Sequence, residues 1–209
     1  DHRDLHSFPT RRSSDLLKPT SKKTHKVGGN MGGTKRELYR FIDRLRIQLG
    51  VKPLSQPIDT IAFCRSQKNI ELVYHPFSTS GFCATALLGE KGDTIVLNAR
   101  HSVEELNFDC GHELIHLTKH RGLGLSSFHC FDTLKPKQDP FIEWEANEGA
   151  AELTVPYRSF LPLLSDAYPQ LRTWQDMDFL RYRLARRYQV TETVIAYRME
   201  SLKYEFFQY

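Results

Sequence analysis

Several features that would assign this 209-residue chain to a common class are missing from its sequence. The four cysteines, Cys64, Cys83, Cys110 and Cys130, are widely spaced and form no C-x-x-C pair, which argues against a disulfide framework or a zinc ribbon. No apolar run approaches the ~20 residues of a membrane-spanning helix, and there is no signal-peptide pattern. We therefore expect a cytoplasmic protein with reduced cysteines that acts on no membrane.

The chain also has little net charge once its N-terminal region is set apart. Residues 1–16, DHRDLHSFPTRRSSDL, match the codon-by-codon translation of a sequencing-library adapter, and we interpret them as non-native. Residues 17–30 carry four lysines and no acid, as either a genuine basic arm or upstream DNA read in frame before Met31; we favour the second. Residues 31–209 then hold 22 basic and 22 acidic residues, so the formal charge of +4 is no evidence for nucleic-acid binding.

The remaining sequence suits one compact domain with a C-terminal appendage. Two capping boxes, T-x-x-E at Thr34 and S-x-x-E at Ser102, predict helices that end near Gly50 and Lys119, with a shorter helix over 58–66. Strand-like runs cover 70–75, 82–88 and 94–98, and the last two are predicted to form a hairpin. Residues 120–140 read as irregular, a helix begins near Pro140, and two more helices follow Asp176.

The segment FDCGHELIHLTKH, residues 108–120, contains the motif H-E-x-x-H at His112, Glu113 and His116. Residues four apart on a helix share one face, with Cβ atoms about 5–6 Å apart, so both histidines can reach one metal ion. Glu113 lies beside the first histidine and can reach a water molecule on that ion, whose pKa zinc lowers to about 7. The spacing indicates peptide hydrolysis by activated water, whereas the simpler interpretation is a helix with two partly exposed histidines.

A second helix, in EWEANEGAAELTVP, offers a third metal ligand. Glu143 and Asn147 are four residues apart and share a face, so Glu143 can complete three protein ligands while Asn147 holds the outer nitrogen of a ligand histidine. The alternative is that Glu143 and Glu145 are solvated on an acidic helix face. The small residues 149–151 indicate that one side of this helix packs closely against another.

Competing metal motifs fail on spacing. The longer pattern H-E-x-x-H-x-x-G-x-x-H needs glycine and histidine where the chain has Lys119 and Gly122. His120, His129 and Cys130 fall in the segment that reads as irregular, and we interpret them as solvated or structural. Candidates for the group that stabilises the oxyanion are His101, Tyr157 and Arg158.

HELIHLTKH followed by EWEANEGAAELTVP resembles the ImmA/IrrE family of metallo-endopeptidases, over roughly residues 57–164. The resemblance implies His112, His116 and Glu143 as ligands of one divalent ion, most simply Zn²⁺, with Glu113 as general base and Asn147 in support. Glu145 fits the family pattern less well than Glu143. LTVP at 153–156 replaces the LLMP of many relatives.

The resemblance also implies the fold and the function. We expect an α+β, zincin-like domain over 31–170 with a small antiparallel sheet, and a C-terminal helical segment over 171–209 packed on it. Relatives are cytoplasmic and cleave helix-turn-helix repressors of mobile elements or stress responses, so a protein substrate is expected and nucleic acid is not. Residues 184–202 look like a helix-turn-helix, and the alternative is therefore a non-proteolytic regulator that binds DNA or a partner and keeps a structural metal.

Overall fold

The structure is a computed structural model that describes residues 33–206. Residues 1–30 lie outside the described residues, so the adapter and read-through interpretations stay predictions. In chain order the elements are α1 (Lys35–Gln48), α2 (Thr60–Ser66), β1 (Ile70–His75), β2 (Phe82–Leu87), β3 (Asp93–Asn98), α3 (Val103–Lys119), a 3₁₀ turn (Arg121–Leu123), β4 (Ser127–Phe131), α4 (Pro140–Thr154), α5 (Tyr157–Ala167), a 3₁₀ turn (Tyr168–Gln170), α6 (Trp174–Tyr188), α7 (Glu192–Ser201) and α8 (Lys203–Phe206).

Four strands form one mixed sheet in the order β1-β3-β2-β4. The predicted β2–β3 hairpin is confirmed, and β2 also runs antiparallel to β4. β1 pairs with β3 in the parallel direction, so the expectation of an antiparallel sheet is wrong for this pairing. The reason is that β3 folds back from the hairpin into the position between β2 and β1, which separates two strands that are neighbours in the sequence.

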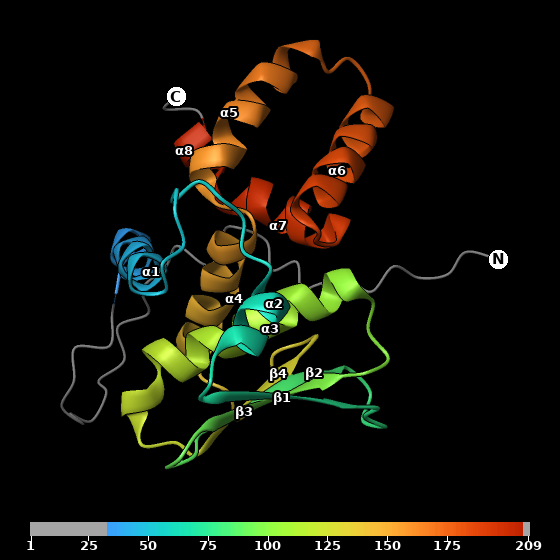
Figure 1. Cartoon of the computed structure of the whole chain (residues 1–209). Helices are drawn as coiled ribbons and strands as arrows, with labels where there is room; N and C mark the ends of the chain where they lie inside the picture. Colours follow the sequence, from blue (N-terminus) through green and yellow to red (C-terminus); the bar gives the residue numbers. More distant parts are fainter. Residues whose placement is uncertain (1–32, 207–209) are drawn as a thin grey trace, which may run out of the picture.

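Helix α3 is the centre of the molecule (Figure 1). It packs on the sheet through β2, β3 and β4 and also meets α4, which in turn contacts α1 and α7. Helices α5, α6 and α7 stand together at the end of the molecule away from the sheet. The fold is thus α+β, as expected.

Two hydrophobic clusters meet at α4. Ala146 and Leu153 belong to the cluster formed with the sheet and α1–α3, whereas Ala150 and Ala151 belong to the cluster formed with α5–α7. Burial of apolar surface stabilises a fold by about 25 cal/mol per Å². Because α4 contributes side chains to both clusters, packing on two sides fixes the position of this helix. The same packing fixes the position of Glu143, which lies on α4.

The local signals in the sequence account for most helix ends. Both capping boxes are formed, at Thr34–Glu37 and at Ser102–Glu105. Gly50 follows α1 with φ +72°, a left-handed conformation that glycine adopts without strain. Asp139 caps α4 ahead of Pro140.

Several elements were not predicted, among them β4 and α5. The segment 120–140, expected to be irregular, contains β4 and a 3₁₀ turn, because β4 forms only by pairing with β2. Helix α5 was missed; Pro162 lies inside it, and proline inside a helix is a breaking signal. No helix within residues 33–206 is long and apolar enough to cross a membrane.

Candidate metal centre and active site

Helix α3 buries several polar side chains. All residues from Leu106 to Leu117 are buried, including Asn107, Asp109, His112, Glu113 and His116. Burying a polar group costs free energy unless it has a partner. Asn107 has structural partners, since its amide accepts from the Thr60 backbone N–H and donates to the Gln189 carbonyl. The other four form the candidate centre and the cluster beside it.

The three predicted metal ligands come together from two helices. The Nε2 atoms of His112 and His116 are 3.0 Å apart on α3. Glu143 on α4 places Oε2 3.3 Å from Nε2 of His112 and Oε1 3.9 Å from Nε2 of His116. One ligand atom from each of the three side chains lies within 4.8 Å of the other two. Glu143 is therefore directed into the protein and is not solvated on an acidic face.

This arrangement fits a divalent ion held by two imidazoles and one carboxylate. Tetrahedral ligands at about 2.0–2.1 Å from zinc are about 3.3 Å from one another, close to the separations of these side chains. Burial lowers the pKa of His116, and the neighbouring His112 lowers it further. The imidazole of His116 is thus neutral, which is the form that binds a metal.

Close packing of α3 against α4 brings the ligands within reach. A Cβ atom on Gly149 would lie 2.8 Å from Cγ1 of Ile115, and one on Gly111 would lie 3.5 Å from Cβ of Ala150. The small residues 149–151 of α4 were predicted to serve this purpose. Any larger side chain at Gly149 would push the two helices apart and move Glu143 away from the histidines.

Outer hydrogen bonds orient both histidines. Nδ1 of His112 lies 2.9 Å from Oδ1 of Asn147, the contact expected from the spacing of Glu143 and Asn147. Nδ1 of His116 lies 2.9 Å from Nδ1 of His120, which in turn lies 3.1 Å from Oε2 of Glu145 through its Nε2. Such outer partners fix the ring orientation of ligand histidines.

The structure decides between the alternatives left open for His120 and Glu145. His120 is structural and not solvated, and Glu145 does not lie on a solvated acidic face, because their exposed fractions are 3% and 4%. His120 ends α3 as its C-cap, and Nζ of Lys119 lies 3.1 Å from Glu145. The signal available in the sequence was the i, i+4 spacing of His116 and His120, which repeats that of His112 and His116.

Glu113 is a buried carboxylate next to this centre. It is fully buried, and within residues 33–206 neither of its oxygens has a hydrogen-bond partner. Burial raises its pKa to about 8, against the opposing effect of His112; the Ala86 backbone also lowers the pKa but does not reach hydrogen-bond geometry. An unpaired buried carboxyl group costs free energy, so the site is built for a further polar species at this position.

A cavity of about 340 Å³ opens beside the centre. Asn147 and His101 are among its lining residues, and Nδ1 of His101 lies 2.8 Å from Oδ2 of Asp109. The other two oxyanion candidates have different contacts. Tyr157 stacks on Tyr39 with a centroid distance of 5.5 Å, and Arg158 forms two 2.8 Å hydrogen bonds to Asp43. Of the three candidates, only His101 lines this cavity.

An H-E-x-x-H helix packed on a mixed sheet, with a second helix alongside, defines a zincin-like α+β domain. The family model described as the IrrE N-terminal-like domain, Peptidase_M78, matches residues 65–200. The chain therefore belongs to this family of peptidases, which confirms the resemblance to ImmA/IrrE, and it is a member of a hydrolase family. The matched residues extend through α6 and into α7. No curated protein matches the chain.

Proposed function

We propose that this peptidase is a zinc-dependent endopeptidase with one catalytic ion held by His112, His116 and Glu143. The observation that supports it most is the convergence of these side chains from α3 and α4 beside the buried carboxyl group of Glu113, which has no hydrogen-bond partner within residues 33–206. Three protein ligands with one position left open are typical of a catalytic zinc site. A site that serves structure alone is normally closed by four protein ligands.

In the proposed hydrolysis, the ion and the surrounding residues have separate roles. The bound ion would supply Lewis acidity, polarising the scissile carbonyl and making water a stronger acid. The positive charge of a bound ion would favour the ionised form of Glu113, and the carboxylate then takes the proton from the attacking water and delivers it to the departing amine nitrogen. Asn147 and His120 hold the two imidazoles in orientation through their outer nitrogens. The burial of His112, Glu113 and His116 limits their contact with bulk water, which strengthens electrostatic interactions at the site.

For the substrate we propose a helix-turn-helix repressor of a phage or mobile element, met in the cytoplasm. The family resemblance supports this choice. The burial of α7 argues against the alternative, in which the C-terminal helices read DNA. Its only basic residue, Arg198, is fully buried, and its exposed residues are the acidic Glu192 and Glu200. A DNA-reading helix needs an exposed face with donors for phosphates and base edges.

The test is cleavage of a purified helix-turn-helix repressor by the zinc-loaded protein, with products mapped by mass spectrometry. Glu113→Gln removes the proton acceptor and leaves the three ligands in place. We expect cleavage to fall by at least about 10²-fold, the range for loss of a general base, while bound zinc stays at one ion per centre. Glu104→Gln is the matched control, because Glu104 lies in the first turn of the same helix, is half-buried and belongs to none of the possible metal-ligand groups within residues 33–206.

Full cleavage by Glu113→Gln would contradict the proposal. So would an unchanged rate after zinc is removed by a chelator. Tight, sequence-specific DNA binding in a gel-shift assay, together with no proteolysis, would favour the regulator instead.

A further inference from the structure

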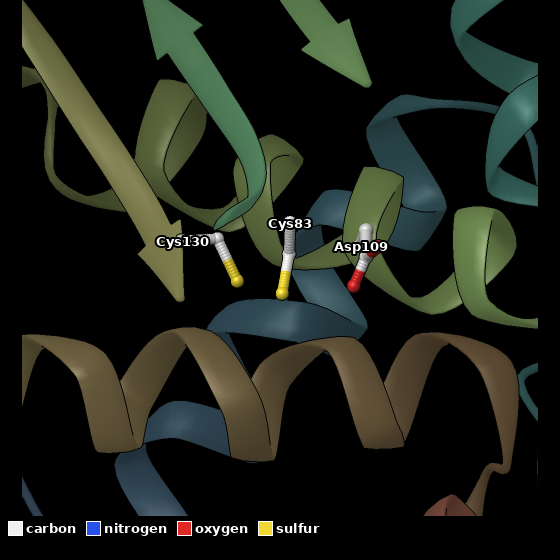
Figure 2. Close-up of side chains that lie close together, drawn as sticks. All are labelled: Cys83, Asp109 and Cys130. Carbon is white, nitrogen blue, oxygen red and sulfur yellow. The ribbon is translucent and has the colours of Figure 1, made fainter. Parts of the chain in front are cut away.

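Two cysteines and an aspartate lie next to the candidate centre without belonging to it. Figure 2 shows Cys83, Cys130 and Asp109 with their side-chain ends close together. One ligand atom from each, a sulfur or a carboxylate oxygen, lies within 4.8 Å of the other two. The side chains come from β2, β4 and α3. The peptidase mechanism above uses none of them.

The sheet brings the two thiols together. Ala84 on β2 pairs with Cys130 on β4, and the register between these strands shifts between Phe82 and Ala84, at Cys83. Such a bulge re-aims a side chain, and bulges are common next to functional sites. If the pairing continued regularly from Ala84, Cys83 would lie opposite Phe131. The bulge instead brings Cys83 beside Cys130.

Asp109 completes a three-ligand set. It lies one helical turn before His112 on α3, with an exposed fraction of 7%. Its Oδ2 is 2.8 Å from Nδ1 of His101, which fixes the carboxylate and leaves Oδ1 for another partner. A histidine behind a ligand carboxylate is a common outer support in metal sites.

The cluster is also accessible. All three side chains and His101 line the same cavity of about 340 Å³. A hydrated ion can therefore reach the sulfur atoms, and a water molecule can occupy a fourth position. The other two cysteines differ in this respect, because Cys64 and Cys110 are 0% exposed in the sealed core. Neither belongs to any of the possible ligand groups found within residues 33–206.

We propose that Cys83, Cys130 and Asp109 bind a second, thiophilic divalent cation such as Zn²⁺ or Cd²⁺. Thiolate sulfur selects such ions over Mg²⁺ or Ca²⁺, which prefer oxygen. On binding, the two thiols lose their protons to solvent and two metal–sulfur bonds form, with no change of oxidation state. Cys130 also lies within 4.8 Å of ligand atoms of His112 and Glu113, so this ion would sit beside the peptidase centre.

The experiment is a titration of the reduced, metal-free full chain with Cd²⁺ under anaerobic conditions. The readouts are bound metal per chain and the ultraviolet charge-transfer absorption of cadmium thiolate. His112→Ala/His116→Ala removes the catalytic centre, and we expect it to bind one Cd²⁺ with the full absorption. Cys83→Ser/Cys130→Ser should bind one Cd²⁺ fewer than wild type and lose the absorption. Failure of the proposed function therefore leaves this outcome unaffected.

Two further measurements test whether Cd²⁺ binds at Cys83 and Cys130 and not at other cysteines. Cys64→Ala/Cys110→Ala is the matched pair and should keep the absorption, with folding checked by circular dichroism. In wild-type protein, which needs no substitution, Cd²⁺ should slow alkylation of Cys83 and Cys130 at least tenfold. The proposal is overturned if wild type shows no thiolate absorption, if the absorption survives Cys83→Ser/Cys130→Ser, or if Cd²⁺ leaves alkylation unchanged.

Discussion

At the scale of single residues, the buried polar side chains of the candidate centre lower the stability of the fold and at the same time provide its chemical groups. The carboxyl group of Glu113 is buried and has no hydrogen-bond partner in the part of the chain that the structure describes, and both histidines occupy positions that apolar side chains would fill at lower cost. Functional sites are where such costs are tolerated. A contact at the outer nitrogen of each ring offsets part of the cost of burial, with Asn147 for His112 and with His120 for His116.

The contact between Asn147 and His112 leads to a prediction about metal affinity. Asn147→Ala removes the oxygen that lies 2.9 Å from Nδ1 of His112, so the ring loses its fixed orientation. We expect zinc affinity to fall by about 10–100-fold, the range for loss of an outer partner. Competition with a chromophoric chelator measures it.

The conservative variant Asn147→Asp keeps an acceptor at the same position and should bind zinc nearly as tightly as wild type. Equal affinities for Asn147→Ala and wild type would show that His112 does not depend on this contact.

At the scale of elements, the spacing between α3 and α4 sets the geometry of the centre. Gly149→Ala would bring a Cβ atom to 2.8 Å from Cγ1 of Ile115. Overpacking costs about 1–3 kcal/mol, and alanine returns up to about 1 kcal/mol through its helix propensity. We expect a net loss of about 1–2 kcal/mol in the free energy of unfolding, measured by urea denaturation, and weaker zinc binding.

Gly122→Ala is the control, because a Cβ atom there would meet no atom within 4 Å. Its free energy of unfolding should stay within about 0.5 kcal/mol of wild type. A Gly149→Ala protein as stable as wild type would mean that α3 and α4 can separate freely.

Most helices could be predicted from the sequence, whereas the pairings of β1 and β4 could not. Capping boxes predicted α1 and α3, and the first-turn residue Pro140 predicted α4, because these signals are local. The parallel partner of β1 and the whole of β4 depend on pairing between distant residues, as in Ala86 with Phe128. Periodicity carries no information about such partners. The burial of His120 and Glu145 could not be predicted for the same reason, because it involves a contact between α3 and α4, with Nε2 of His120 3.1 Å from Oε2 of Glu145.

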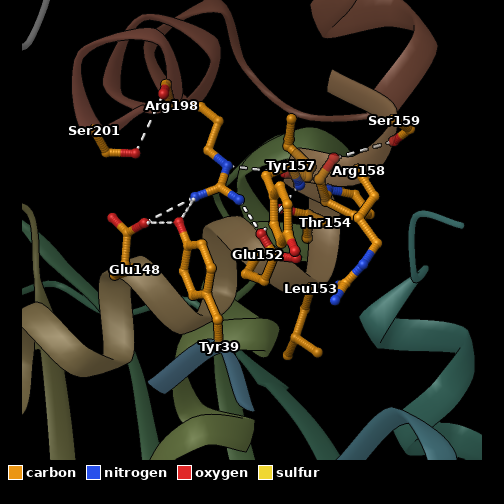
Figure 3. Close-up of polar contacts among 12 residues, drawn as sticks. Tyr39, Glu148, Glu152, Leu153, Thr154, Tyr157, Arg158, Ser159, Arg198 and Ser201 are labelled. Atoms are coloured by element: carbon orange, nitrogen blue, oxygen red, sulfur yellow. Dashed lines mark hydrogen bonds and ion pairs between the residues drawn. The ribbon is translucent and has the colours of Figure 1, made fainter. Parts of the chain in front are cut away.

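A buried ion cluster joins α4 to α7 and α1 (Figure 3). Arg198 on α7 is fully buried; its Nη1 lies 2.8 Å from Oε1 of Glu148, and its Nη2 pairs with Oε2 of Glu152. Its Nη1 also lies 2.6 Å from the hydroxyl of Tyr39 on α1. Removing one partner from such a cluster typically costs about 3–5 kcal/mol, because it leaves a buried charge unpaired.

The two glutamates of this cluster differ in their pKa. Burial acts to raise the pKa of Glu148, but Arg198 and Lys35 outweigh it and hold the pKa below its ordinary value. Burial raises the pKa of Glu152 to about 7, against the pull of Arg198. The contacts agree with this difference, since one oxygen of Glu152 has no hydrogen-bond partner within the described residues and can carry a proton.

A pH dependence of stability follows from Glu152. A carboxyl group whose pKa is about 7 when folded and 4.5 in the ordinary state binds its proton more tightly in the folded protein. The free energy of unfolding therefore falls as pH rises from about 4.5 to about 7, by an amount on the order of 3 kcal/mol, and is constant above. Urea denaturation at about pH 5 and about pH 7.5 measures the difference.

Glu152→Gln should remove this part of the slope, while Glu71→Gln, at an exposed glutamate on β1 outside the cluster, should leave it in place. An identical slope in Glu152→Gln and wild type would assign the proton to another group.

At the scale of the whole molecule, an ion held between α3 and α4 should stabilise both hydrophobic clusters, because α4 belongs to both. Zinc at about 100 times its Kd adds about 2.7 kcal/mol to the free energy of unfolding, provided that the unfolded chain does not bind it. For a domain of this size, that corresponds to a rise in Tm of about 5–10 °C.

This prediction is best measured in a Cys83→Ser/Cys130→Ser background, so that only the ligands on α3 and α4 contribute. His116→Ala should abolish the rise in Tm on adding zinc. His129→Ala should keep it, because His129 is exposed on β4 and contacts Thr85 instead of the centre. An equal rise in His116→Ala and His129→Ala would mean that zinc stabilises the fold from some other site, and that α3 and α4 are held together by packing alone.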